Sequence, residues 1–349
     1  MFQLRFFPFR RLGCAVIATL LMTAGIAAEE IIRLSNAEVE IEIAPRLGGR
    51  ITSFRRRGGK NVLFSVADAG RENAVPSLHY RREFRQYYGH VMWLGPQSAW
   101  WQQQEAEPVP REKGWNWPPD PYWEFSRFAV IFPMEDRVLL ISGHSPFSGV
   151  TMTKEVRLRR NGVELRTAIV NTGKRRVSWG LWSNTRVCAD AVVCVPADPE
   201  QPLKYEFKTW DILNEKMLTG EIVNGYFVFR TPGREAGDNR IYKGKSFLVP
   251  ARPEIIARIG KCIFVKRTHP VSPSEIAPGH CPTEIYAELG GTGRKSFWEL
   301  EFHGEYRTLD PGDALTFSEY WALHPEEPAD IAEKTRQEKR EADTRIRTE

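Results

Sequence analysis

Aromatic and polar side chains concentrate in the segment Gly89–Phe125, where they could form a binding surface for a sugar. This segment holds six of the eleven tryptophans and six prolines. Trp and Tyr rings suit the apolar C–H patches of a sugar, and prolines hold such a platform in place at small entropic cost. Prolines also interrupt helices and strands, and a long ordered loop inside a compact domain is often functional. The substrate-binding residues predicted here are Trp93, Trp100, Trp101, Trp117, Asp120 and Tyr122.

The alternative for the same segment is purely structural. Trp side chains are usually well buried, so each ring could pack the loop onto the rest of the domain. Gln97 and Gln102–Glu105 lie between the tryptophans and offer hydrogen-bonding groups that suit sugar hydroxyls. We expect at least one or two exposed rings in the cluster.

Arginine-rich segments supply a second type of chemistry. Arg55–Arg57, Arg81-Arg82 and Arg85 could bind an acidic sugar or a phosphate through bidentate contacts. The alternative is a solvated charged face, since Arg55–Arg57 lead into a Gly-Gly turn. The sequence has no recognised zinc spacing, phosphate-binding loop, dinucleotide fingerprint or Gly-x-Ser-x-Gly elbow. It therefore predicts no metal and no cofactor.

The elements that must position these side chains are strands. In Ala37–Ala44, aliphatic residues alternate with glutamates, as in a half-buried strand. Asn161-Gly162 is a strong hairpin signal between Val156–Arg160 and Val163–Val170. Short spacing without alternating helices predicts an all-β antiparallel sandwich. Further predicted strands are Arg50–Phe54, Val62–Phe64, Phe128–Phe132, Arg137–Ile141, Val177–Ser183, Tyr226–Arg230, Cys262–Arg267, Ser296–His303 and Ala314–Leu323.

Residues 1–28 have the pattern of a secretory signal peptide. Three arginines precede the apolar stretch Leu12–Ile26, and small residues follow, so we expect cleavage after Ala27 or Ala28. The alternative is an uncleaved anchor. The remaining chain has 46 basic and 44 acidic residues, a balance that gives no support to nucleic-acid binding. No later segment is apolar for 18 residues, so we expect a soluble periplasmic or secreted protein with no membrane span after cleavage.

The mature chain reads as one domain, residues 29–327, followed by a charged tail, residues 328–349. The chain has 349 residues, of which 42% are hydrophobic, enough to bury a large core. Four cysteines remain after residue 28, and in an oxidising compartment they allow three pairings. The pairing Cys188–Cys194 and Cys262–Cys281 has the shortest loops and is favoured among the three. Four buried free thiols are the alternative, so the connectivity stays open.

Short segments spread in order over most of the chain carry a family resemblance. They are Leu34–Asn36, Pro45–Phe54, Asn61–Phe64, Gly89–Gln97, Trp117–Pro121, Ile263–Arg267, Glu284–Tyr286, Trp298–Glu301, Leu309–Asp313 and Trp321–Leu323. Each segment alone is weak evidence, but the ordered set resembles the galactose-mutarotase-like (aldose 1-epimerase-like) superfamily. It is most similar to an uncharacterised domain-of-unknown-function branch found in exported bacterial proteins. The resemblance implies an antiparallel β-supersandwich, with two large sheets and a sugar-binding groove on one concave face.

The resemblance also implies candidate catalytic residues. In the superfamily's sugar epimerases, a Glu on a late strand is the base toward the anomeric hydroxyl, and a mid-chain His is the acid toward the ring oxygen. Glu299 and Glu301 match the base, because they precede the Leu309–Gly312 turn and, two residues apart on a strand, share one face. Glu284 is a third candidate and is assigned to the substrate-binding set. All three could instead be solvent-facing carboxylates.

The expected acid has no match. The mid-chain segment Trp179–Arg186 contains no histidine, and neutral Ser or Asn cannot donate a proton as an imidazolium can. Asn184 and Arg186 of this segment are assigned to substrate binding. His90 could replace the acid from the Trp-rich segment, or it could be a packed, satisfied residue.

Three functional hypotheses follow from these observations. The first is an exported carbohydrate-binding protein that lacks the usual epimerase acid. The second is a sugar-processing enzyme, aldose epimerase or lyase-like, that uses a late-strand Glu. The third is a noncatalytic structural envelope protein with buried tryptophans. The partner expected for the first two is a mono- or oligosaccharide, neutral or acidic.

Overall fold

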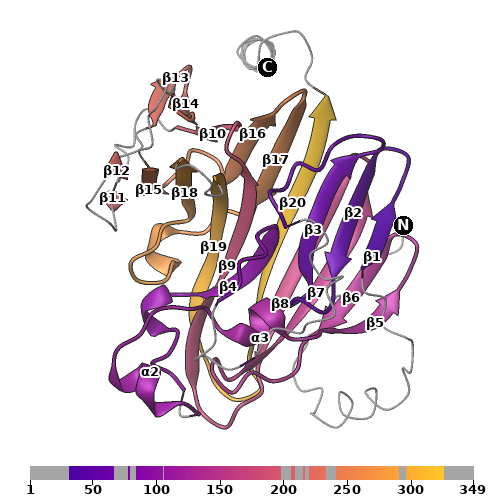
Figure 1. Cartoon of the computed structure of the whole chain (residues 1–349). Coiled ribbons are helices and arrows are strands. Elements are labelled where there is room, and N and C mark those ends of the chain that lie inside the picture. The colour runs from indigo at the N-terminus through magenta and orange to yellow at the C-terminus, as the bar shows by residue number, and fades with distance from the viewer. Residues whose placement is uncertain are drawn as a thin grey trace, which may run out of the picture.

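Two mostly antiparallel sheets of ten strands each face one another in a computed structural model of the chain. The structure describes residues 31–66, 78, 84–104, 106–197, 206–208, 215–216, 220–232, 241–290 and 296–325. The proposed signal peptide and the charged tail lie outside the described residues. Among those residues, no helix is long and apolar enough to cross a membrane. The all-β sandwich predicted from strand spacing is confirmed (Figure 1).

The first sheet, called sheet I, is built from strands drawn from both ends of the described chain. Its order is β1-β2-β3-β4-β9-β19-β18-β15-β11, with β12 parallel to β15. All other pairs in this path are antiparallel. The strands are β1 (Ile32–Ser35), β2 (Val39–Ala44), β3 (Arg50–Arg56), β4 (His90–Gly95), β9 (Val177–Cys188), β11 (Glu206–Lys208), β12 (Glu215–Lys216), β15 (Ile241–Leu248), β18 (Thr283–Gly290) and β19 (Phe297–Leu309).

The second sheet, called sheet II, covers one face of sheet I. Its order is β13-β14-β10-β16-β17-β20-β8-β7-β6-β5. The core between the sheets is aromatic: Phe54 of sheet I packs on Phe264 and Trp321 of sheet II, with ring centroids 5.9 and 5.6 Å apart. The strands are β5 (Ala129–Pro133), β6 (Arg137–Ile141), β7 (Val150–Arg159), β8 (Gly162–Asn171), β10 (Val192–Pro196), β13 (Glu221–Val223), β14 (Tyr226–Phe229), β16 (Glu254–Ile259), β17 (Cys262–Thr268) and β20 (Ala314–Pro325).

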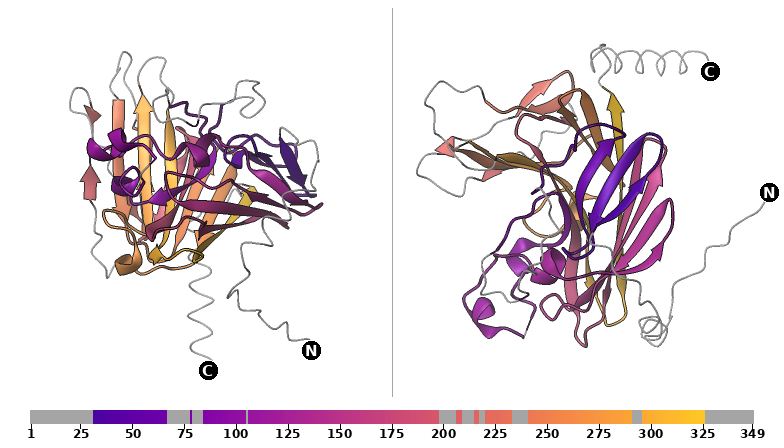
Figure 2. Two further views of the ribbon diagram at one scale, coloured as in Figure 1. Left: turned by 90° about the horizontal axis from the view of Figure 1, so that it is seen from below. Right: turned by 45° about the vertical axis from the view of Figure 1, so that its right-hand side comes forward.

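Local sequence signals set several of these elements. The Asn161-Gly162 signal is confirmed, since β7 and β8 form a hairpin in which Leu158 pairs with Val163 and Arg159 with Gly162. The Trp-rich segment begins as a regular strand, β4, and then forms η1 (Gln97–Ala99), α2 (Pro108–Glu112) and α3 (Pro121–Phe125). A second single-turn helix, η2 (Pro273–Glu275), precedes β18. Figure 2 shows α2 and α3 together beside the strands of sheet I.

Gly48 fixes α3 against the sandwich. Its φ is +65°, and a Cβ there would lie 1.9 Å from the backbone oxygen of Trp123. Its N–H also donates to the Ser126 carbonyl, 2.8 Å away. Only glycine allows both this backbone conformation and this close approach, so the Gly48-Gly49 turn determines where the end of the Trp-rich segment is held.

The cysteine pairing favoured from the sequence is wrong, because Cys188, Cys194, Cys262 and Cys281 form no disulfide with one another. Each favoured pair is divided between the two sheets. Cys188 ends β9 in sheet I whereas Cys194 lies in β10 of sheet II; Cys262 begins β17 in sheet II whereas Cys281 precedes β18 in sheet I. Burial raises the pKa of the Cys188 thiol to about 12 and that of Cys194 to about 11, so neither is activated toward oxidation.

Candidate functional site

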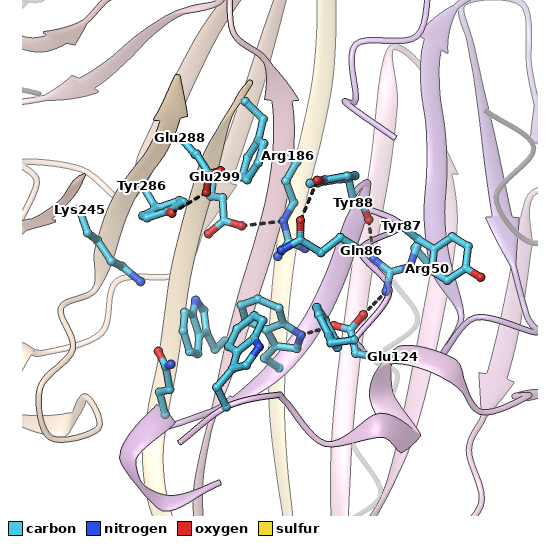
Figure 3. Close-up of a pocket in the computed structure, with 16 residues that line it drawn as sticks. Arg50, Gln86, Tyr87, Tyr88, Glu124, Arg186, Lys245, Tyr286, Glu288 and Glu299 are labelled. Atoms are coloured by element: carbon cyan, nitrogen blue, oxygen red, sulfur yellow. Dashed lines mark hydrogen bonds and ion pairs between the residues drawn. The ribbon is translucent and has the colours of Figure 1, made fainter. Parts of the chain in front are cut away.

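A cleft of about 110 Å³ opens on the face of sheet I that points away from sheet II (Figure 3). Side chains of β4, β9, β15, β18 and β19 form its floor, and the Trp-rich segment with residues 84–88 forms its rim. The residues that line it are Arg50, Phe84, Gln86, Tyr87, Tyr88, Trp93, Gln97, Trp117, Glu124, Trp182, Arg186, Lys245, Tyr286, Glu288, Phe297 and Glu299.

Strand register explains why distant residues meet on this floor. One row of cross-strand neighbours runs Arg186, Glu299, Tyr286 and Lys245 over β9, β19, β18 and β15. Residues directly opposite each other on adjacent strands point to the same face, so all four side chains reach the cleft. Glu299, predicted as the base, therefore lies beside Arg186, predicted to bind substrate.

Trp117 is the exposed indole of the cleft, with 43% of its surface accessible. Its ring packs edge-on against Phe84 and Trp93, with centroids 5.0 and 6.5 Å apart. The expectation of one or two exposed rings holds for Trp117. The other predicted tryptophans are buried: Trp93 is 4% exposed, Trp100 4% and Trp101 0%.

The buried indoles have structural partners. Trp100 Nε1 donates to the Leu94 carbonyl and Trp101 Nε1 to the Pro118 carbonyl, 2.5 and 2.8 Å away. Trp93 Nε1 donates to Glu124, and this ring still forms one wall of the cleft. Packing of the loop thus accounts for Trp100 and Trp101, which lie outside the set of residues that line the cleft.

Asp120 and Tyr122 also serve the loop rather than the cleft. Asp120 is the N-cap of α3: its Oδ1 accepts from the Tyr122 N–H at 2.9 Å, and its Oδ2 accepts from the Ser145 hydroxyl at 2.5 Å. Burial raises the pKa of Asp120 to about 6, although these hydrogen bonds favour its ionised form. Neither residue belongs to the cleft lining.

Five charged side chains stand together at the floor, and none of the three predicted carboxylates lies on the open surface. Lys245 Nζ lies 2.6 Å from Oε2 of both Glu284 and Glu301. Glu299, two residues from Glu301 on β19, accepts from Arg186 Nε at 2.8 Å. Glu284 and Glu301 are fully buried and Glu299 is 9% exposed, so Glu299 is the carboxylate that reaches the cleft.

These contacts separate the protonation states of the two neighbouring glutamates. Burial opposes ionisation of Glu299, but Arg186 and a hydrogen bond with Glu301 lower its pKa below the ordinary value. Burial, Glu299 and Glu284 raise the pKa of Glu301 well above its usual range, despite Lys245. Burial also opposes the charge on Lys245, yet its two carboxylate neighbours raise its pKa. An ionised carboxylate beside a protonated one is the arrangement that acid–base chemistry requires.

Asn184 supports this floor from below the surface. Its Nδ2 donates to Glu301 Oε1 at 3.2 Å, and the residue is fully buried. Asn184 therefore orients a predicted catalytic residue and does not line the cleft itself.

His90 points away from the cleft, into the space between the sheets. Its Nδ1 lies 2.9 Å from Thr185 Oγ1, and its ring packs on Trp321 of sheet II, with centroids 4.9 Å apart. Burial and Lys266 lower its pKa well below the ordinary value, so the ring is neutral. This placement matches the second possibility raised from the sequence, in which His90 is packed in the core with its polar contacts made. Sheet I separates His90 from Glu299.

Several residues of the site had no sequence signal. Lys245 belongs to a strand that was not predicted, and Arg50 and Glu124 form a buried ion pair between β3 and α3. Of the arginines that were singled out, Arg55 and Arg57 bind Glu40 on β2, and Arg81 and Arg82 lie outside the described residues. Arg85 lies in the rim segment, with its guanidinium 5.1 Å from the centroid of the Tyr87 ring.

His280, Glu284 and His303 form the one cluster within the described residues that could hold a metal ion, with their ligand atoms within 4.8 Å of one another. Two observations oppose a metal here. The Lys245 ammonium already neutralises Glu284, and the Gln97 N–H donates to His280 Nε2 at 3.3 Å. With Nε2 accepting, the proton sits on Nδ1 and is donated to Glu284 Oε1, 3.0 Å away, so Nδ1 has no free lone pair for a metal.

This architecture is that of the galactose-mutarotase-like proteins. A galactose mutarotase-like protein from Lactobacillus casei superimposes with a TM-score of 0.52 at 12% identity, covering 84% of this chain and 100% of that one. A galactose mutarotase related enzyme from Lactobacillus acidophilus gives a TM-score of 0.54 at 8% identity, over 85% and 98% of the two chains. A Synechocystis protein, Slr1438, gives 0.53 at 12% identity, over 94% and 100%.

The chain itself belongs to the family described as Domain of unknown function (DUF4380), which matches residues 30–324. The resemblance seen in the sequence, to an uncharacterised branch of this superfamily, is therefore confirmed. Comparison with curated proteins gives no significant match.

Proposed function

We propose that the protein binds carbohydrate in the cleft on sheet I. The observation that carries the proposal is that the exposed ring of Trp117 and the carboxylate of Glu299 line the same cleft. An indole face packs on the C–H side of a sugar ring, while carboxylate and guanidinium groups bind its hydroxyls. The fold adds support, because structurally similar proteins are named as galactose mutarotase-like or galactose mutarotase related.

Fixed polar groups around the ring suit recognition of hydroxyls. Arg186 and Glu299 hold each other, and the Tyr286 hydroxyl donates to Glu288 at 3.3 Å. Side chains that are ordered before a ligand arrives lose little entropy on binding. The cleft is therefore a preorganised polar floor beneath an aromatic wall.

A titration followed by Trp fluorescence tests this proposal. Neutral and acidic mono- and oligosaccharides are added to the wild-type protein and to Trp117→Ala. We expect the variant to lose about tenfold or more in affinity, since a stacked ring contributes roughly 1.5 kcal/mol. Tyr320→Ala is the matched control, because Tyr320 is an aromatic residue, 38% exposed, on β20 of the other sheet. If no saccharide changes the signal, carbohydrate binding is refuted and the structural envelope role gains support.

A second candidate function is sugar processing, as an aldose epimerase or lyase-like enzyme with Glu299 as the base. The observation that favours it is the pair Glu299 and Glu301, whose pKa values are moved in opposite directions on one strand. Polarimetry of a freshly dissolved aldose detects interconversion of anomers. If the protein is an enzyme, anomers must interconvert faster in its presence than in buffer alone. This acceleration must be lost in Glu299→Gln, because an amide cannot accept the proton.

Export by a cleaved signal peptide completes the proposal. It rests on the arginines and the apolar stretch of residues 1–28. Amino-terminal sequencing of the protein from a periplasmic or culture fraction is the test. A mature chain that begins at residue 28 or 29 is expected, and an intact residue 1 in the cytoplasm would refute export.

A further inference from the structure

Arg186 has an unusual position among the cleft residues, because it is buried but only partly bonded. The residue is 6% exposed. Its Nε donates to Glu299 Oε1 at 2.8 Å, and its guanidinium lies over the ring of Trp93, 4.7 Å from the centroid. Among the described residues, its two Nη groups have no acceptor. Figure 3 shows the guanidinium between Glu299 and Gln86, facing the cleft.

The other two cations of the cleft are held by partners at their charged ends, although Arg50 Nε has no acceptor among the described residues. Arg50 donates through Nη1 to the Tyr88 carbonyl and through Nη2 to Glu124. Lys245 is shared between Glu284 and Glu301. The Nη groups of Arg186 are not among the buried, unpartnered polar atoms of the described residues, so they face the cleft, where an acceptor on a ligand can reach them.

We propose that Arg186 selects an acidic sugar, binding the carboxylate of a uronic acid unit through its two Nη groups. This inference rests on the carbohydrate-binding function proposed above and names its substrate class. A planar carboxylate matches the Nη edge of a guanidinium in a bidentate pair. The Nε side is already held by Glu299, which orients that edge toward the cleft.

The surrounding charges favour a monoanion over a dianion. Three carboxylates line the cleft, those of Glu124, Glu288 and Glu299. The other two lining cations, Arg50 and Lys245, are already paired with carboxylates, so a second negative charge on the ligand meets repulsion and gains no further cation. A carboxylate carries one charge, whereas a phosphate ester carries close to two at neutral pH. The flat Trp93 face behind the guanidinium also holds it in the plane that a carboxylate needs.

Matched pairs of sugars test this inference on the full chain. Calorimetry and Trp fluorescence compare glucuronate with glucose and galacturonate with galactose, with glucose 6-phosphate as the phosphate arm. We expect each uronate to bind about tenfold or more tightly than its neutral partner, the strength of a charge-assisted bidentate contact. We expect the preference to shrink as salt increases, and the phosphate to bind more weakly than the uronate.

Variants assign the preference to one side chain. Arg186→Gln should abolish the difference between uronate and neutral sugar, and Arg186→Lys, which keeps the charge but not the fork, should retain only part of it. Arg176→Gln is the matched control, because Arg176 is an exposed arginine paired with Asp310. Thermal unfolding identifies any variant that has lost its fold. If Arg186→Gln is unfolded, the inference is tested instead by the wild-type ratio of affinities for uronate and neutral sugar, and by the salt dependence of that ratio.

Each outcome has a defined meaning. Equal affinity for uronates and neutral sugars overturns the selection by Arg186 while carbohydrate binding stands. A preference that survives in Arg186→Gln overturns the assignment to this residue. Tighter binding of the phosphate ester overturns the choice of a carboxylate. No response to any sugar overturns both this inference and the proposed function.

Discussion

The buried ion pair between Arg50 and Glu124 makes a sharp prediction about stability. Both side chains are almost inaccessible, at 1% and 2%. Glu124 also accepts from Trp93 Nε1, and Arg50 also donates to the Tyr88 carbonyl, so one pair joins β3, β4, α3 and the cleft rim. Substituting Glu124→Gln removes the negative charge and leaves the Arg50 guanidinium buried without a counter-ion.

Removal of one partner from a buried pair costs about 3–5 kcal/mol, because the remaining charge has lost both water and its partner. That is a large part of the 5–15 kcal/mol that typically separates folded from unfolded domains. Urea unfolding followed by Trp fluorescence and by circular dichroism measures the change. We expect a clear fall in the midpoint for Glu124→Gln.

A control and a double variant separate this mechanism from general disruption. Asp310→Asn breaks an exposed pair with Arg176 and should leave the midpoint unchanged within error. Arg50→Met combined with Glu124→Leu removes both charges and should be more stable than Glu124→Gln alone. If Glu124→Gln unfolds at the same urea concentration as Asp310→Asn, the pair is not buried in the way described.

Three further predictions concern other parts of the sandwich. Gly48→Ala should destabilise the protein and weaken sugar binding, since its Cβ would meet the Trp123 carbonyl at 1.9 Å; Gly58→Ala, at a glycine with no atom within 4 Å of its Cβ, tests backbone strain alone in the same unfolding assay. Burial lowers the pKa of Lys154 to about 7, so the unfolded state binds more protons between pH 7 and 10.5 and stability should rise with pH in that window. Lys154→Met should remove this rise, and an unchanged slope in unfolding free energy against pH would contradict the burial of its ammonium. A thiol titration of the purified protein should find four reduced cysteines after residue 28 that react slowly when native and quickly in denaturant; two disulfides would contradict the structure.

The sequence predicts much of this fold because strands carry local signals. Alternation in Ala37–Ala44 and the turn at Asn161-Gly162 reflect two-residue periodicity and turn conformation, both readable from neighbouring residues. The strand β4 was not predicted, because the six prolines and dense tryptophans after it obscure a six-residue apolar run. Those prolines instead support the short helices that hold Trp117 at the rim.

The alternation of side chains along a strand also explains why His90 does not point into the cleft. His90 and Trp93 are three residues apart on β4, so they point to opposite faces of the sheet. Trp93 lines the cleft, which places His90 in the space between the sheets. If β4 had been recognised as a strand in the sequence, this alternation would have placed His90 on the face opposite Trp93. His90 would then not have been a candidate acid for the cleft.

Lys245 and its contacts depend on register between strands that are distant in the sequence. Its neighbours in the row come from β18, β19 and β9, and no local pattern specifies which residue of one strand lies opposite which residue of another. The sequence therefore indicates Glu299 and Arg186 as separate candidates, whereas the structure brings them together.

The last two strands have a consequence for how the chain can fold as it is made. β19 lies between β9 and β18, and β20 lies between β17 and β8, so each is an interior strand of its sheet. A nascent polypeptide that ends before Phe297 has a gap in the middle of both sheets and cannot complete either one. We expect such long-range pairing to postpone completion of both sheets until these strands have left the ribosome, so that earlier strands stay accessible to chaperones for longer.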